Sequence, residues 1–433
     1  MNNNIWATLR NSWKSLDLRR KIIFTAFIII LFRIGISIPV PFLNSDNISS
    51  FFNSDGSLLA YFNMLSGNAL AQGTVFALTV QPYINASIII QLLTVALPPL
   101  ERLAKDGGEA GRQKIQAITR YVTIGIALIQ AFGYYSILRY QSNAVSETSG
   151  AMGWIAMAAI VLVLMAGSML VMWMGESIDE KGIGNGVSMI LFASIVSRGT
   201  DLVMYGYRSA VLGNWWIIPV VLVLGLLMLT FIVFMDGAER RIPIQYAKRQ
   251  VGRKLYGGQN SFLPIKVAMT GVMPIIFTYA IVGLPATIAQ FLGANNGFRL
   301  FVEKWFSPTS VIYIVLSFIL IIAFNYFYIS IQYNPVEISN NIKNNGGTIP
   351  GIRPGKPTAD FIIKCVNKVT LFGALFLGVI AVLPYILQAI FGDAISGLAI
   401  GGTSVMILVS VALETVKSLE SQMLMRSYKG FLE

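Results

Sequence analysis

The sequence predicts an all-α, polytopic membrane protein whose ten transmembrane helices form two pseudo-symmetric, inverted halves of five. Three observations predict this fold class: an apolar composition, ten apolar windows, and loops that alternate in basic residues. Of the 433 residues, 55% are hydrophobic and only 12% are charged. A soluble chain of this length would need far more polar surface to cover its core.

The apolar windows follow one another along the whole chain. They cover residues 21–39, 74–97, 119–138, 152–174, 184–204, 215–235, 271–292, 309–331, 366–390 and 397–416. A helix needs about 20 predominantly apolar residues to cross a bilayer, and each window is close to that length. The N-terminal stretch "MNNNIWATLRNSWKSLDLRRK" lacks the apolar core of a signal peptide, so we expect the first window to be retained as a span.

Basic residues set the orientation of the spans. With the N-terminus inside, the cytoplasmic segments hold 26 of the 32 Lys and Arg residues. Such an excess predicts that both termini lie in the cytoplasm. Arg33 falls inside the first window but near its outer end, where a long basic side chain is expected to extend to the interface.

The two halves, residues 1–208 and 209–433, have matching sequence strings. "VQPYI" in the second window resembles "VMPII" in the seventh, and "GNGVSMIL" in the fifth resembles "GGTSVMIL" in the tenth. Because five spans per half is an odd number, matching segments cross the membrane in opposite directions. This is typical of an inverted repeat, although short apolar strings also match by chance.

One apolar segment is too short to cross the membrane. Leu58–Leu70 lies on the predicted outer side, before the second span. A stretch of this length is typical of a re-entrant, interfacial or packed helix. It is interpreted either as a surface helix or as a movable stopper in an outer funnel.

The second window is unusually polar for a membrane span. Carboxamides are tolerated in a bilayer only where they face protein or water, and a proline inside a helix frees a backbone carbonyl. The window therefore predicts a helix face turned toward a polar or hydrated space. The residues that carry this prediction are Gln81, Pro82, Asn85, Ser87 and Gln91.

Branched aliphatic residues stand among these polar ones. Val80 and Ile84 share one side of the second span, and Val187 and Leu191 repeat the same spacing on the fifth. Each pair alone is explained by ordinary helix packing. Together they are also consistent with an aliphatic ring that closes a narrow aqueous path by dewetting.

Two long cytoplasmic loops, 236–270 and 333–365, are rich in Gly, Pro and Tyr. Their basic residues suit an anionic partner such as ribosomal RNA or an acidic protein surface. Contact with anionic lipid headgroups is a better explanation for basic residues directly beside a span, such as Arg19, Arg20 and Lys21.

The residues that are missing weaken two other function classes. The chain has no histidine and a single cysteine, Cys365, so the commonest general base and metal ligand is absent. Every Asp and Glu lies in a loop or at a span end, as do Asp201, Asp236 and Glu414. An intramembrane enzyme is therefore disfavoured, as is a secondary carrier for a small solute. We expect no catalytic residue, metal or cofactor.

Several long strings resemble the SecY family, the channel subunits of the general protein translocase. They are "FRIGISIPVP", "PYINASIIIQLL", "GEAGRQK", "KGIGNGVS", "RRIPIQYAKRQVGRK", "PGIRPG" and "GGTS". The resemblance covers essentially the whole chain. It implies an hourglass of ten helices that opens sideways to lipid, with an aliphatic ring at its waist and a short plug helix below it.

The resemblance also implies roles for particular residues. The plug is expected around Tyr61–Leu70, including Phe62, Asn63, Met64 and Leu65, and the lateral gate at Asn85, Gln91 and Leu284. Arg253, Lys254 and Arg353 are expected to dock the motor ATPase SecA or a translating ribosome. The ring is expected at Val80, Ile84, Val187, Leu191, Ile276 and Ile407.

Further partners implied by the resemblance are the small membrane subunits SecE and SecG, signal peptides, nascent chains and membrane lipids. The implied location is a bacterial cell membrane. One position departs from the family pattern: Ala268 stands where the family often has an asparagine of a polar cluster near the gate. Thr270 is a partial substitute, and the cluster is left unassigned.

Overall fold

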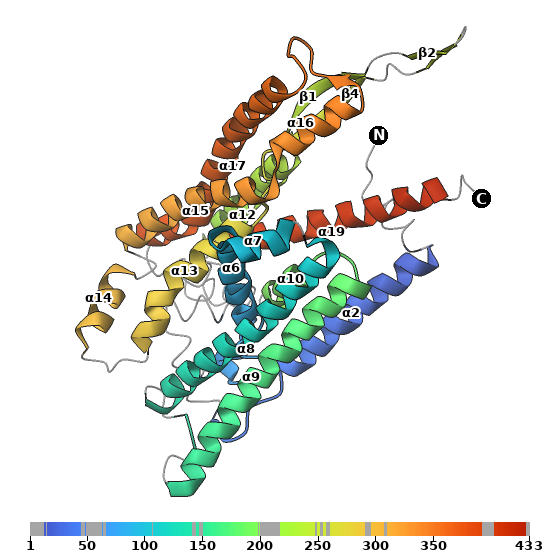
Figure 1. Ribbon diagram of the computed structural model, residues 1–433. Helices are drawn as coiled ribbons and strands as arrows, with labels where there is room; N and C mark the ends of the chain where they lie inside the picture. Colours follow the sequence, from blue (N-terminus) through green and yellow to red (C-terminus); the bar gives the residue numbers. More distant parts are fainter. Residues whose placement is uncertain are drawn as a thin grey trace.

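The structure is a computed structural model, and it is built mainly from helices (Figure 1). It describes residues 13, 15–44, 48, 63, 66–105, 107–140, 144–146, 150–197, 199, 217–246, 249–251, 254–256, 260–290, 296–306, 310–391 and 402–429.

Each of the ten apolar windows contains a helix. These are α2 (Leu16–Ile36), α6 (Gln81–Ala96), α8 (Gly108–Tyr140), α9 (Gly150–Lys181), α10 (Gly186–Ser197), α12 (Ile217–Gly237), α13 (Met273–Gln290), α15 (Val311–Gln332), α17 (Lys356–Phe391) and α19 (Gly402–Lys429). Shorter helices lie between them: α5 (Ala69–Gln72), α7 (Pro98–Lys105), α14 (Gly297–Trp305) and α16 (Pro335–Asn344).

The helices differ in how much of a membrane they could cross. Within the described ranges, four are long and apolar enough to span it, in α8, α9, α15 with its continuation, and α17. The pair α6 and α7 would make a fifth, bent by 105°. Shorter apolar helical stretches among the described residues are Gly186–Ser197, Leu222–Gly237 and Met273–Pro285. An apolar window thus records hydrophobicity but not helix length.

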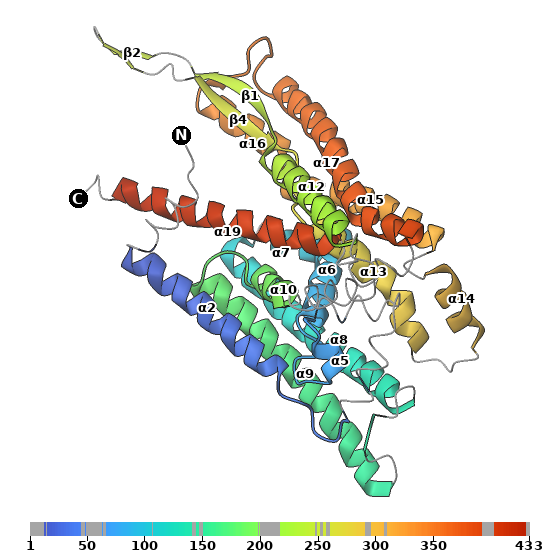
Figure 2. The same ribbon diagram turned by 180° about the vertical axis from the view of Figure 1, so that it is seen from behind.

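The helices pack into two groups that meet at several places, one of them between α2 and α19, where Lys21 Nζ donates to Gln422 Oε1. In one group α2 packs on α9, and α8 packs on α6 and α9; in the other α15 packs on α13 and α17, and α12 packs on α19. The groups meet where α10 contacts α19 and where α13 contacts α6 and α8. Figure 2 shows α10, α6 and α13 in the middle of the molecule, with α19 crossing beside them.

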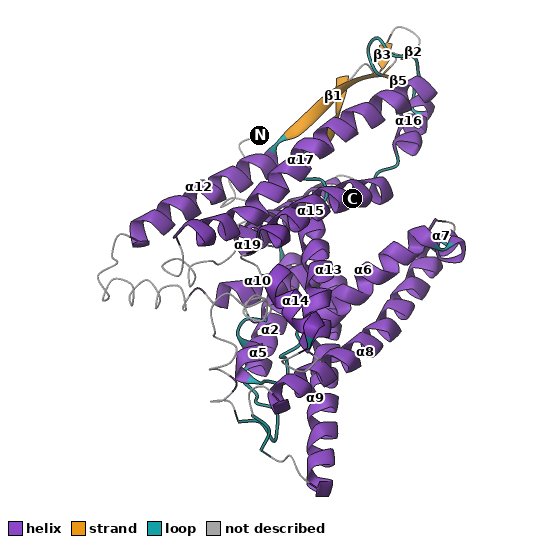
Figure 3. Cartoon of the chain, turned by 90° about the vertical axis from the view of Figure 1, so that its left-hand side faces the viewer, coloured by secondary structure: helices purple, strands orange, loops and turns teal. Residues whose placement is uncertain are grey.

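The all-α prediction omitted a small β-structure. β1 (Glu239–Tyr246) pairs antiparallel with β4 (Asn260–Lys266) and with β5 (Gly347–Thr348), and β2 (Arg249–Val251) pairs with β3 (Lys254–Tyr256). The strands gather at one end of the molecule beside α16 (Figure 3). Their sequence signal is the alternation of buried Ile242 and Ile244 with exposed Arg241 and Pro243, which has the period of a strand.

The sheet joins the two long loops into one body. Ile244 and Ile265 from its strands pack in an apolar cluster with Ile329 of α15, Ile349 and Ile362. One loop supplies β1 and β4, and the other supplies β5 and α16. Buried side chains from both loops therefore fix this end of the molecule to α15 and α17.

Pro82 does not kink a helix, so the expectation of a freed carbonyl was wrong. α6 starts at Gln81, which places Pro82 in the first turn, where a helix has no intrahelical partner for the missing N–H. The preceding residues form turns, and Thr79 has a left-handed φ of 48°. Pro274 is likewise the second residue of α13.

Candidate aliphatic ring and its surroundings

The structure brings together the aliphatic residues that were expected to form a ring. Leu191 and Ile407 are buried in one apolar cluster, with 4% and 2% of their surface exposed, and the partly buried Ile84, Val187 and Ile276 pack against that cluster. Val80 is fully buried in an adjacent cluster, and Ile84 and Val187 pack against this cluster as well. Residues from four helices thus converge on one apolar region.

These residues converge because their helices start at this region. Val80 is the N-cap of α6, and Val187 is the second residue of α10. Ile276 lies in the first turn of α13, and Ile407 in the second turn of α19. Discontinuous membrane helices of this kind bring backbone ends and side chains to the middle of a membrane protein, where a pathway can pass.

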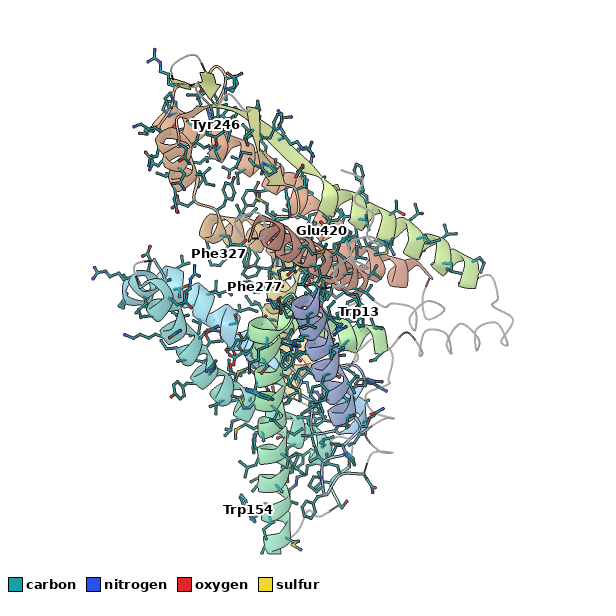
Figure 4. The ribbon with its side chains drawn as sticks, turned by 90° about the vertical axis from the view of Figure 1, so that its right-hand side faces the viewer. Trp13, Trp154, Tyr246, Phe277, Phe327 and Glu420 are labelled. Carbon is teal, nitrogen blue, oxygen red and sulfur yellow. The ribbon has the colours of Figure 1, made fainter. Side chains whose placement is uncertain are left out.

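Figure 4 places this region along the molecule. Phe277, next to Ile276, lies in the middle, Tyr246 of β1 lies toward one end and Trp154 of α9 lies toward the other. Trp154 is exposed, as is common for tryptophan near a membrane surface. The apolar region therefore stands between the two ends of the molecule.

The expected plug falls mostly outside the described residues. Tyr61, Phe62, Met64 and Leu65 are among those not described. Asn63 is described and is only 2% exposed.

Asn63 is hydrogen-bonded to the segment 66–73, which contains α5. Its Oδ1 accepts the N–H of Ala71 at 2.9 Å, and its Nδ2 donates to Asn68 Oδ1 at 2.9 Å. The hydroxyl of Tyr134 on α8 donates to the carbonyl of Leu70. The segment 66–73 is thus fastened to α8 by the hydroxyl of Tyr134.

The expected gate residues lie on α6 and α13, which are in contact. The Oδ1 atom of Asn85 is buried and has no hydrogen-bond partner within the described part of the chain, whereas Gln91 donates to Ser87 Oγ at 3.3 Å. A buried amide oxygen normally requires a donor, such as water. Leu284 on α13 is 48% exposed.

Of the expected docking residues, Arg353 is described most fully. It is exposed on a loop that is held in two places: Ser339 Oγ donates to the carbonyl of Gly355, and Thr358 Oγ1 to that of Arg353, both at 2.8 Å. Lys254 lies in β3, and Arg253 is outside the described residues. The loop therefore presents Arg353 from a fixed backbone.

The sequence analysis missed one buried polar network. Thr270 Oγ1 donates to Asn325 Oδ1 at 2.6 Å, and Asn325 Nδ2 donates to the carbonyl of Thr370 at 3.0 Å. All three residues are buried. The signal was present, because Asn325 is the only carboxamide in its apolar window. Thr270 thus has a buried partner on α15, close to buried Ala268.

A chain with several helices long and apolar enough to span a membrane, and with helix ends that meet in one apolar region, is typical of channels and carriers. The sequence profile of the SecY family matches residues 74–416, which are most of the chain. The chain belongs to the SecY family. It is 41% identical to the protein translocase subunit SecY of Streptomyces galbus over 431 residues, covering 97% of this chain and 98% of that relative.

Other relatives and solved structures agree with this assignment. The SecY subunit of Corynebacterium glutamicum is 42% identical over 443 residues, covering 98% of this chain and 99% of the relative. A solved structure of a protein conducting channel superposes with a TM-score of 0.66 at 17% identity, covering 94% of this chain and 93% of that chain. Sec61 in the canine ribosome-channel complex gives 0.63 at 16%, with the same coverage. These structures establish the shared fold.

Proposed function

We propose that this protein is the central subunit of the Sec protein translocation channel. It conducts unfolded secretory polypeptides across the membrane and releases hydrophobic segments sideways into the lipid. The observation that carries the proposal is the convergence of Val80, Ile84, Val187, Leu191, Ile276 and Ile407 on one apolar region, in a chain of the SecY family.

An aliphatic ring suits a cargo that varies in size and charge. Its side chains pack around a passing chain without requiring a fixed pattern of hydrogen bonds, and a narrow apolar constriction excludes water when it is empty. A segment of about 20 residues gains about 0.3 to 0.6 kcal/mol for each strongly apolar residue that enters lipid at the centre of a bilayer. A sideways opening therefore separates membrane helices from secreted chains by partition.

We also propose that residues 1–208 and 209–433 form two inverted halves of five helices each. The helix packing supports this division, because among the described helices the larger contacts between the groups are those of α10 with α19 and of α13 with α6 and α8, with a further contact of α2 with α19. The backbone before α6 and α13 supports it too. A residue with positive φ, Thr79 or Gly271, stands three positions before Pro82 or Pro274.

In this arrangement the lateral gate opens between α6 and α8 on one side and α13 and α15 on the other. Asn85, Gln91 and Leu284 are its proposed residues, and the unpartnered Oδ1 of Asn85 supports a hydrated or exchangeable environment there. The plug is proposed around Tyr61–Leu70, and the carbonyl of Leu70 accepts a hydrogen bond from Tyr134 of α8.

The proposed partners follow from the family and from the cytoplasmic sheet. Arg253, Lys254 and Arg353 form the proposed dock for the motor ATPase SecA or a translating ribosome, and SecE and SecG complete the channel. Two solved structures with this fold carry ribosomes, the canine Sec61 complex and the yeast Ssh1 complex bound to the 80S ribosome. The proposed location is a bacterial cell membrane, with both termini in the cytoplasm.

Site-specific crosslinking tests the proposal. In a Cys365→Ser background, single cysteines replace Ile84, Ile276 or Leu227, and Leu227 is the control because it is 61% exposed on α12. A secretory chain with one cysteine is stalled midway in membrane vesicles. Crosslinks at Ile84 and Ile276 but not at Leu227 are expected. If the secretory chain is verified to be stalled and no crosslink forms at either ring position, the proposal is contradicted and the carrier hypothesis becomes the alternative.

A further inference from the structure

Two valine residues, one in each proposed half, are held in the same way. The N–H of Val75 donates to the carbonyl of Ile38, just past the end of α2, at 3.0 Å. The N–H of Val267 donates to the carbonyl of Ala238, just past the end of α12, at 2.9 Å. Each valine stands seven residues before the proline that opens the next helix. Both valines are therefore anchored through their N–H groups.

The carbonyl group of each valine meets a glycine. A Cβ atom on Gly167 of α9 would lie 2.0 Å from the carbonyl oxygen of Val75, and one on Gly373 of α17 would lie 2.3 Å from that of Val267. Both distances are far below van der Waals contact, and the atom in the way is backbone, so no change of rotamer relieves the overlap. Only glycine leaves these carbonyls where they are.

The backbone between each contact and the ring has little freedom. After Val75, hydrogen-bonded turns join Thr79 to Phe76 and Gln81 to Leu78 before α6 begins. After Val267, the N–H of Gly271 donates to the carbonyl of Ala268, and α13 begins two residues later. A displacement of either carbonyl would therefore move the start of the helix that follows.

The ring residues lie directly beyond these turns. Val80 and Ile84 follow Val75, and Ile276 follows Val267. We propose that Gly167 and Gly373 are positioning residues: each seats the segment that leads into a ring-bearing helix and so sets the place of its half's ring residues. The inference rests on the proposed function, in which the ring seals the closed channel.

Glycine-to-alanine variants test this inference. Gly167→Ala and Gly373→Ala are compared with Gly125→Ala in α8 and Gly225→Ala in α12, where a Cβ meets nothing within 4 Å. The measurements, made in vesicles carrying the complete translocase, are ion leak without cargo and export of a chain whose signal sequence carries a charge in its apolar core. Protein abundance and export of the same chain with an intact signal are measured in parallel.

A positioning role predicts a specific combination of results. Gly167→Ala and Gly373→Ala are expected to raise ion leak and defective-signal export several-fold while abundance and intact-signal export stay near normal, with both controls unchanged. A purely structural role would lower abundance and all export together. The inference is overturned if the two variants match the controls, or if neither accumulates. If only one of the two variants accumulates in the membrane, its ion leak and defective-signal export decide the result.

An Ile84→Asn variant keeps the two proposals separable. If it leaks and the glycine variants do not, the ring seals the channel but the glycines do not position it. If the Ile84→Asn variant also shows no increase in ion leak or in defective-signal export, the proposed seal itself is wrong.

Discussion

The segments that lead into α6 and α13 follow the same backbone course, yet they come from different structures. Before α6 the chain passes through the segment 66–73, which contains α5. The side chains of Asn63, Ser66 and Tyr134 make hydrogen bonds to this segment. Before α13 it passes through β4, which is held by a backbone ladder to β1. The first segment is held by side-chain as well as backbone hydrogen bonds, whereas the second is held mainly by the peptide backbone.

The difference matches the roles proposed for the two ends. A plug that moves during each translocation event needs an attachment made of few bonds, whereas a dock that transmits force needs a rigid one. A ladder of backbone hydrogen bonds is insensitive to most side-chain changes, while a side-chain hydrogen bond is lost with one substitution. The comparison therefore predicts unequal responses to mutation in the two regions.

The largest difference is expected between Asn63→Ala and Ser261→Ala. The first removes two hydrogen bonds from a buried site, and each partner left unsatisfied costs about 1 to 3 kcal/mol. The second changes an exposed residue of β4 and should alter stability by no more than about 0.5 kcal/mol. Hydrogen exchange of the amides of residues 66–73, including Ala71, measures the loss of stability. Equal protection in both variants would contradict the comparison.

A smaller effect is expected at the turn before α13. Thr270→Val keeps the side-chain shape but removes the donor to buried Asn325, at a cost of about 1 to 2 kcal/mol. The matching position before α6 is the apolar Leu78, so this polar link belongs to one half only. Thermal unfolding of the purified protein measures the cost. Thr230→Val is the control, since that threonine is exposed on α12, and an equal change in both would argue against the network.

The smallest effect on stability is expected for Arg353→Glu, because the side chain is exposed and its loop is held by other residues. Stability should change by no more than about 0.5 kcal/mol. Motor-driven export should nevertheless fall strongly, because the reversal repels an acidic partner surface. Lys304→Glu on α14 is the matched control on the proposed outer face. Normal SecA-dependent export by the Arg353 variant would remove this residue from the proposed dock.

Hydropathy and spacing predicted where helices form, and a helix lies in each of the ten windows. The same spacing, with the family resemblance, selected six aliphatic residues that the fold brings together. Both predictions rest on local patterns of apolar residues, because those patterns determine directly which residues are buried. The role of the six residues as a seal is still a prediction.

Features that depend on packing between distant segments were not predictable in this way. β5 has two residues and pairs with a strand about a hundred positions earlier, so its sequence carries almost no strand signal. The contact of Gly167 with the Val75 carbonyl is likewise invisible in sequence, because it depends on how α9 lies against a turn. Pro82 was assigned to the interior of a helix because a helix that begins within an apolar window causes no change in hydropathy at its first residue.

The pairing of β1 with β5 also has a consequence for the order in which the protein is made. β1 ends at Tyr246, but its partner Gly347 is synthesised only after α13, α14, α15 and α16. A chain still on the ribosome thus completes this sheet only when those helices have emerged. The proposed dock consequently takes its final form late, and an unfinished copy lacks the surface to which Arg353 is proposed to contribute.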